Sequence, residues 1–258
     1  MSEARTTVAY EAPLNERIRT FLRLEYLFRQ FAHFRQDRSR HGMRTMLHIL
    51  IDVLTLLSKS DYKTEILKEL GEQHAGLSRL ASRDGVDPAS LAQVLGELEQ
   101  AIDAMQNLAT QFVGTALRDN EFLLSVQNRF TLPGGTCSFD APALHHWLHR
   151  PASRVQRDLE AWYAELEPFS IAIGLYLRLL RQSTDGESAV AGSGMYVETP
   201  DAPYLLVRVL VSEELDAFPE ISAGRHRFTI RFMQIRDINQ PARQVAVDIP
   251  FLLQRCSL

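Results

Sequence analysis

The residue types that could support catalysis or metal binding lie close together near the middle of the chain. His145 and His149 are one helical turn apart, a spacing that can bring two imidazoles to one metal ion. Ser138 and Asp140 precede His145 and are the residue types of a hydrolase triad, and Cys137 suits its thiol version. The sequence contains no H-E-x-x-H motif and no G-x-S-x-G elbow. We therefore expect helical histidines that are packed or solvated, and no catalytic residue, metal or cofactor.

A glycine-containing segment precedes these residues. Pro133-Gly134-Gly135 lacks the lysine and the glycine spacing of a phosphate-binding loop, so we expect a tight turn there. Residues 136–140 are expected to be a short extended segment. Asp140 is then expected to cap a helix that begins near Pro142.

Arginines are concentrated in two other places. Eight of them lie in the first predicted helix and the turn after it: Arg17, Arg19, Arg23, Arg29, Arg35, Arg38, Arg40 and Arg44. A second basic strip, Arg225, Arg227 and Arg231, occupies one face of a predicted strand. Arginine is suited to bidentate capture of carboxylates and to stacking on aromatic rings. Any one of these side chains could simply be solvated, but as a set they favour a binding surface for a protein partner.

Composition indicates a folded, cytoplasmic protein. The chain has 258 residues, of which 45% are hydrophobic, so it can bury a substantial core. The formal net charge of -4 argues against a protein whose whole surface binds polyanions. Two cysteines without a C-x-x-C spacing suit a reducing compartment. The N-terminus lacks the apolar region of a secretory signal, and the apolar run from Met46 to Leu57 is interrupted by His48 and Asp52, so no membrane contact is expected.

Helices are expected to position the histidines and the first group of arginines, and a strand is expected to position the second basic strip. After a short polar leader, apolar residues recur at helical spacing from Leu14 to about Gln182, with Pro13 placed in the first helical turn. At Ser183 the period changes to two, and strands are expected over residues 194–199, 204–212, 226–235 and 244–252, with turns at residues 200–203, 219–224 and 239–241. The prediction is an α+β fold, with a helical domain at 1–183 and a C-terminal antiparallel β-sheet domain at 184–258 packed against it.

The third predicted strand has two unlike faces. Phe228, Ile230 and Phe232 alternate with Thr229 and Arg231. Because successive side chains of a strand point to opposite faces, one face should be core and the other basic.

Several stretches of this sequence resemble the ZapD family of bacterial cell division proteins. They are PLNERIRTFLRLE at 13–25, TEILKEL at 64–70, LPGGTCSFDAPALHHWLH at 132–149 and RHRFTIRFM at 225–233. They keep their order over nearly the whole chain, from about Tyr10 to the last strand.

The resemblance implies a helical domain joined to a curved β domain, assembled as a homodimer. It also implies binding to the C-terminal tail of the division protein FtsZ, cross-linking of FtsZ protofilaments at the midcell division ring, and no enzymatic activity. A positively charged pocket for the tail would include Arg23 and His145, with Arg19, Arg118 and Arg129 as neighbouring cations. The sequence departs from the family pattern at Glu121, where an arginine is expected, and Arg118 lies about one helical turn away.

A nucleic-acid-binding protein is the alternative that the arginine-rich first helix leaves open. The acidic overall balance and the lack of a recognised DNA- or RNA-binding module count against it. FtsZ and a second copy of the chain are therefore the expected partners.

Overall fold

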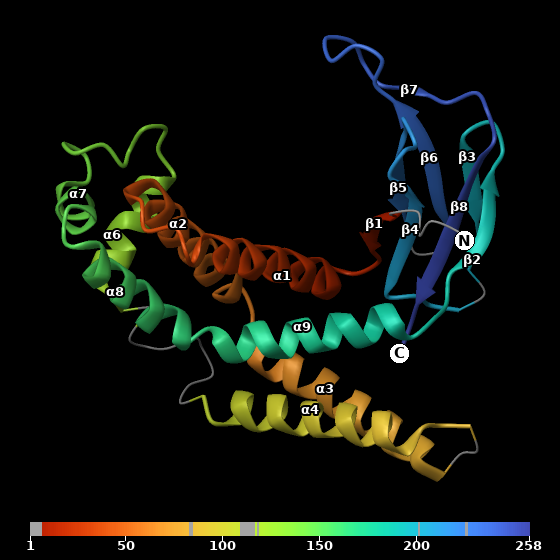
Figure 1. Ribbon diagram of the computed structural model, residues 1–258, viewed down its shortest axis with the longest axis horizontal. Coiled ribbons are helices and arrows are strands. Elements are labelled where there is room, and N and C mark those ends of the chain that lie inside the picture. The colour runs from red at the N-terminus through yellow and green to blue at the C-terminus, as the bar shows by residue number, and fades with distance from the viewer. Residues whose placement is uncertain (1–6, 83–84, 109–116, 118, 201, 225–226) are drawn as a thin grey trace. The chain divides into compact units, whose positions relative to one another are not determined.

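A computed structural model describes residues 7–82, 85–108, 117, 119–200, 202–224 and 227–258. The chain divides into two compact units. Residues 1–20 and 177–258 form one, called here the β unit, and residues 21–176 form the other, the helical unit. The described residues are helical in the first two thirds of the chain and mostly strands in the last third, which confirms the predicted α+β class (Figure 1).

Helices run through the chain from the end of the first strand to Gln182 (Figure 1). Local signals start several of them: Ser39, Asp61, Asp87 and Asn120 each accept a hydrogen bond from a backbone N–H of the first turn. The helices are α1 (Glu16–Phe34), α2 (Arg40–Leu57), α3 (Tyr62–Ser78), the 3-10 helix η1 (Arg79–Ser82), α4 (Pro88–Gln106), α6 (Glu121–Phe130), α7 (Pro142–Leu148), α8 (Ala152–Ala164) and α9 (Glu167–Gln182).

The helical unit is held by aromatic and aliphatic packing. Phe31 of α1 stacks on Tyr163 of α8 with ring centroids 4.3 Å apart, and α2 packs against α6, α7 and α8. Tyr176 of α9 is buried, contacts Phe21 edge-on at 5.5 Å, and donates a 2.9 Å hydrogen bond to Glu69 of α3. The α3–α4 pair is a helical hairpin packed along its length (Figure 1).

The β unit contains two antiparallel sheets, where the sequence had suggested one. The strands are β1 (Thr7–Pro13), β2 (Glu187–Ala191), β3 (Met195–Glu198), β4 (Leu206–Ser212), β5 (Phe218–Ala223), β6 (Phe228–Gln234), β7 (Arg243–Gln244) and β8 (Ile249–Cys256). One sheet has the order β1-β4-β8-β2, and the other has the order β3-β6-β5 with β7 on β6. Val207 and Val209 of the first sheet share one buried core with Phe228, Ile230 and Phe232 of the second.

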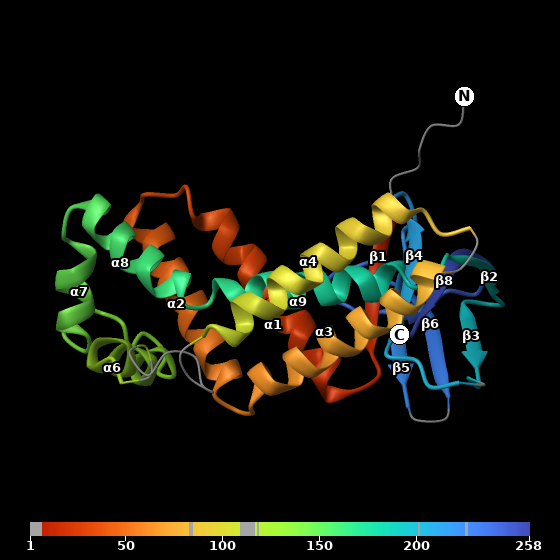
Figure 2. The ribbon, with the colours of Figure 1, turned by 90° about the horizontal axis from the view of Figure 1, so that it is seen from below.

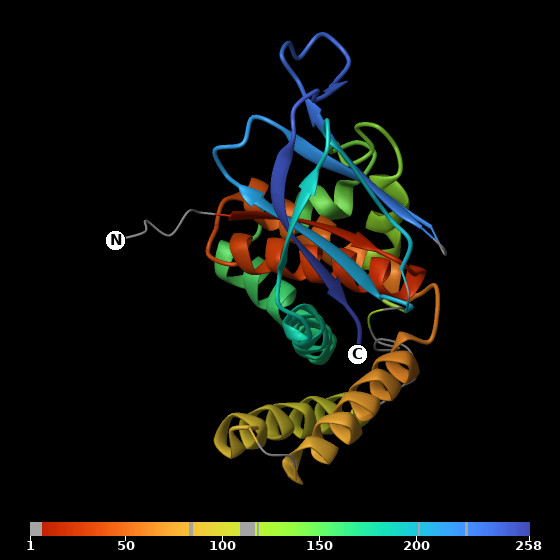
Figure 3. The same ribbon diagram turned by 90° about the vertical axis from the view of Figure 1, so that its right-hand side faces the viewer.

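Three strands were not predicted. Residues 7–13 were predicted as a leader and the start of a helix, but they form β1. This strand pairs with β4, whose residues lie about two hundred positions later in the chain. Figure 3 shows β1 in red among the blue C-terminal strands. Residues 218–223, predicted as a turn, form β5 on β6, and residues 187–191 form β2 on β8. The strands β1 and β2 depend on distant partners for their backbone hydrogen bonds, which local sequence does not reveal. The strand β5 pairs with the following strand and was missed because Pro219 and Gly224 indicated a turn.

The prediction of an extended segment at residues 136–140 is wrong, because these residues form turns. The Cys137 N–H donates to the Gly134 carbonyl at 3.0 Å, and the Ala141 N–H donates to the Cys137 carbonyl at 2.9 Å. These bonds close successive turns, so no extended segment can form. Asp140 does not cap α7; it accepts a hydrogen bond from the Cys137 thiol at 3.3 Å.

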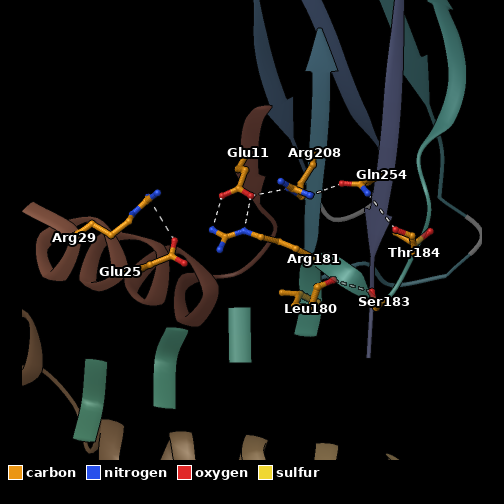
Figure 4. Close-up of polar contacts among 9 residues, drawn as sticks. All are labelled: Glu11, Glu25, Arg29, Leu180, Arg181, Ser183, Thr184, Arg208 and Gln254. Atoms are coloured by element: carbon orange, nitrogen blue, oxygen red, sulfur yellow. Dashed lines mark hydrogen bonds and ion pairs between the residues drawn. The ribbon is translucent and has the colours of Figure 1, made fainter. Parts of the chain in front are cut away.

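A carboxylate shared by two arginines ties the strands of the first sheet to the end of α9 (Figure 4). Glu11 of β1 accepts hydrogen bonds from Arg181 at 2.8 and 2.9 Å and from Arg208 of β4 at 2.8 Å. Burial opposes ionisation of Glu11, but the hydrogen bonds and charges of the two arginines outweigh it and hold the pKa of this carboxyl below its usual range. Glu11 therefore stays ionised inside the β unit.

Candidate partner-binding surface

The helical residues predicted for partner binding lie on three helices. Arg23 is exposed in the second turn of α1, and Arg19 lies one turn earlier, beside Glu16. Arg129 is exposed in the last turn of α6, and His145 is exposed on α7. Two further predicted residues, Arg118 and Arg225, fall outside the described residues.

Only part of this set is brought together. The α7 helix packs on α6 and α2, so His145 and Arg129 lie on neighbouring helices. Figures 1 and 2 both show α7 beside these helices, at the end of the helical unit opposite to the point where α1 enters it. Arg23 lies near the start of the 19-residue helix α1. A single pocket that joins Arg23 to His145 stays a prediction.

Cations and aromatic rings meet where α2, α6 and α7 pack. The Arg44 guanidinium lies 5.7 Å from the centre of the Phe130 ring, and its terminal nitrogen donates to Thr136 in the loop before α7. The His48 imidazole stacks on Phe130 with ring centres 4.2 Å apart. These contacts fix the positions of two basic groups on one ring. We call this region the α6–α7 surface; it consists of Arg44, His48, Arg129, Phe130, Leu132, Phe139, His145 and His149.

The loop from residue 131 to 141 adds apolar side chains to the α6–α7 surface. Phe139 is 83% exposed and Leu132 is 50% exposed. Gly135 is buried here, and a Cβ at this position would lie 2.5 Å from the Arg129 carbonyl oxygen, so only glycine allows the loop to fold back on α6. The tight turn predicted at residues 133–135 is thus confirmed, and it displays two apolar residues beside the basic ones.

The histidines of α7 engage each other. The rings of His145 and His149 are 4.1 Å apart, and Nδ1 of His149 lies 2.7 Å from the His145 carbonyl, to which it donates. Cys137, considered as a nucleophile, donates to Asp140. Within the described residues no three His, Cys, Asp or Glu side chains are grouped to hold a metal.

The second basic strip has a different environment. Arg231 of β6 is exposed, opposite the buried face formed by Phe228, Ile230 and Phe232, as the alternation predicted, and Arg227 is exposed just before this strand. Arg231 is 3.5 Å from Glu220 of β5, which lies directly across from it in the register. Arg231 therefore has a carboxylate neighbour within the β unit.

Sequence reasoning assigned only Arg129 and His145 of the α6–α7 surface to partner binding. Arg44 was counted among the arginines of the first helices but was not assigned to the site, and Phe130 and Phe139 were not considered as ligand contacts. Phe139 lies inside one of the stretches that carry the family resemblance, which was the available signal. The Arg44–Phe130 contact joins two helices distant in sequence and had no local signature.

Comparisons with known proteins find relatives among cell division proteins. A family model described as "ZapD: Cell division protein" matches residues 22–231. A protein named Cell division protein ZapD from Methylococcus capsulatus is 39% identical over 253 residues, covering 97% of this chain and 98% of the relative. Proteins of the same name from Cupriavidus necator and Photobacterium profundum are 38% and 36% identical, each covering 97% of this chain and 99% of the relative.

Among the described residues, no helix combines the length and the apolar character that a membrane crossing requires.

Proposed function

Because this chain belongs to the ZapD family of cell division proteins, we propose that it binds the C-terminal tail of FtsZ and, as a homodimer, cross-links and bundles FtsZ protofilaments. It would do so in the cytoplasm, at the midcell division ring, by binding and not by catalysis. The observation that carries the proposal is the α6–α7 surface, where exposed cations and exposed apolar side chains lie side by side.

The α6–α7 surface fits a tail that contains acidic and apolar residues. Arg129 and His145 are exposed on adjacent helices and can receive carboxylates. Phe139 and Leu132, on the loop between them, offer apolar contacts that a purely electrostatic surface would lack. Aromatic and arginine side chains together are the residue types that dominate the energetics of protein interfaces.

Arg23 is proposed as a separate contact for the tail. It is exposed on α1. A tail bound at the α6–α7 surface of one copy need not reach it, so Arg23 and His145 are to be tested one at a time. Arg19 belongs to the β unit by the division of the chain and is considered below.

Two tail sites in one dimer would provide the cross-link. Once one site is occupied, the second site is presented to a neighbouring filament at a high effective concentration, so bundling can be strong even when each site is weak. Sedimentation equilibrium at micromolar concentration tests this part, because a protein that stays monomeric cannot cross-link by this route.

The test of tail binding is fluorescence anisotropy of a labelled FtsZ C-terminal tail peptide. The protein is titrated as wild type, Arg129→Glu, His145→Ala and Arg23→Glu, at low and physiological salt. Lys68→Glu is the matched control, because Lys68 is an exposed cation on α3, outside the α6–α7 surface. Saturable binding that is lost in the site variants and kept in the control supports the proposal, whereas no binding by the wild-type protein rejects it.

Nucleic-acid binding is the alternative, motivated by the arginines of α1 and α2. A DNA duplex is titrated in the same assay over a salt series. Duplex binding that falls steeply with salt, without any tail binding, would replace the tail proposal by this one.

A further inference from the structure

A pocket of about 260 Å³ lies within the β unit, between two strands that belong to different sheets. Its walls carry both polar and apolar atoms, and the side chains of Arg19 and Glu11 lie among them. The principal lining residues are Tyr10 and Pro13 of β1, Pro219, Ile221 and Ala223 of β5, and Arg19 of α1. The volume is below the roughly 300–1,000 Å³ of small-molecule sites, which favours a guest the size of one or two side chains.

The two strands at this pocket are both sheet edges. In the described residues β1 ends the first sheet and β5 ends the second, and the two lie close to each other. An edge strand presents unpaired N–H and C=O groups to an extended peptide. Pro219 lacks an N–H and interrupts that row on β5, whereas the proline of β1, Pro13, is its last residue. The edge of β1 is therefore the better template.

The charges at the pocket favour an acidic guest. The carboxylate of Glu11 also lines the pocket, but Arg181 and Arg208 already neutralise it. Arg19 pairs with Glu16, whose side chain is 79% exposed, while that of Arg19 is 42% exposed. Exposed ion pairs contribute little to stability, so Arg19 can exchange Glu16 for a carboxylate of a ligand.

We infer that this pocket is a second contact point for the FtsZ tail, which would lie extended along β1 with one apolar side chain in the pocket and a neighbouring carboxylate on Arg19. This inference rests on the proposed function, because it takes the tail as the occupant. It adds a site in the β unit that is separate from the α6–α7 surface of the helical unit. Arg19 thereby becomes a contact of the β1 edge and not a member of a helical pocket.

Filling the pocket is the direct test. Ala223→Leu places a larger side chain among the lining residues, while Ser222→Leu places the same side chain on the neighbouring residue, which points to the other face of β5. Ala223 and Ser222 are both exposed, so both variants should fold, and circular dichroism melting checks this. In the tail-peptide anisotropy assay we expect about a tenfold higher Kd for Ala223→Leu, equal to about 1.4 kcal/mol, and an unchanged Kd for Ser222→Leu.

A second readout locates the tail. Hydrogen–deuterium exchange of the full-length protein is measured with and without the peptide, and slower exchange in residues 7–13 is expected if the tail adds to β1. Wild-type tail binding that is undiminished in Ala223→Leu, with unchanged exchange in β1, overturns the inference and leaves the proposed function standing. No tail binding by the wild-type protein overturns both. Arg19→Gln should weaken binding and reduce its salt dependence.

Discussion

Arginines of the β unit and arginines of the α6–α7 surface have different neighbours. In the β unit, Arg181 and Arg208 share Glu11, and Arg255 of β8 binds Glu198 of β3 at 2.6 and 2.8 Å, which joins the two sheets. On the α6–α7 surface, Arg44 lies against a phenyl ring and a threonine.

The difference shows that residue type alone does not distinguish a structural arginine from a recognition arginine. A guanidinium that is paired with a carboxylate of its own domain has little charge left for a ligand. A guanidinium that is held by an aromatic ring keeps its charge and is already oriented. The carboxylate neighbours, and not the arginines, mark the β-unit network as structural.

The largest effect is expected from removing the carboxylate that the β-unit arginines share. Glu11→Gln leaves Arg181 and Arg208 facing a neutral group, and the free energy of unfolding should fall by about 2 kcal/mol, measured by urea denaturation. Glu220→Gln, which removes the partner of the exposed Arg231, should cost less than about 0.5 kcal/mol. Equal losses in the two variants would contradict the structural assignment of the Glu11 network.

Next comes the charge of the α6–α7 surface. The double variant Arg129→Glu/His145→Ala should raise the Kd for the FtsZ tail peptide by roughly 10- to 100-fold at physiological salt, because it replaces a cation by an anion and removes an imidazole contact. Arg231→Glu on β6 is the matched control and should change the Kd by less than about twofold, since Arg231 already faces Glu220. If Arg231→Glu weakened tail binding more than the double variant, the proposed difference between the α6–α7 surface and the β unit would be contradicted.

A smaller effect is expected from the apolar part of the surface. Phe139→Ala should raise the Kd for the tail by about fivefold through lost apolar contact, with an unchanged melting temperature because Phe139 is 83% exposed. Ile238 in the β6–β7 loop is also 83% exposed and is the control for nonspecific binding to exposed apolar side chains. Should Ile238→Ala weaken binding as much as Phe139→Ala, the α6–α7 surface would lose its special role.

The smallest effect should appear as a pH dependence of stability. Burial opposes ionisation of Glu11 and Glu198, but their arginine partners hold both carboxyl pKa values below the usual value of 4.5. A lowered native pKa stabilises the folded state above the unfolded pKa, so this stability is lost as the pH falls below about 4.5. Urea midpoints measured between pH 6 and pH 3 should fall, and fall less in Glu11→Gln. An identical slope in that variant would exclude a contribution from Glu11.

Local patterns predicted the helices, the change of period at Ser183 and the turn at residues 133–135, because each depends on neighbours within a few residues. Alternation also predicted which face of β6 is buried. The strands β1 and β2 were missed, since each is defined by pairing with a remote strand. The strand β5 pairs with the following strand, β6, and was missed because its proline and the glycine after it indicated a turn. Of the predicted site residues, His145 and Arg129 lie on adjacent helices, and the place of Arg23 beside them stays a prediction.

The amino-acid sequence by itself determined the α+β class and the membership of the ZapD family, because periodicity and ordered motifs are properties of the linear chain. Only the tertiary structure decided that the N-terminal strand joins the C-terminal sheet, that Glu220 neutralises Arg231, and that Arg44 lies over Phe130. These are contacts between residues far apart in sequence. Their strength depends on distance and burial, which a linear pattern does not contain.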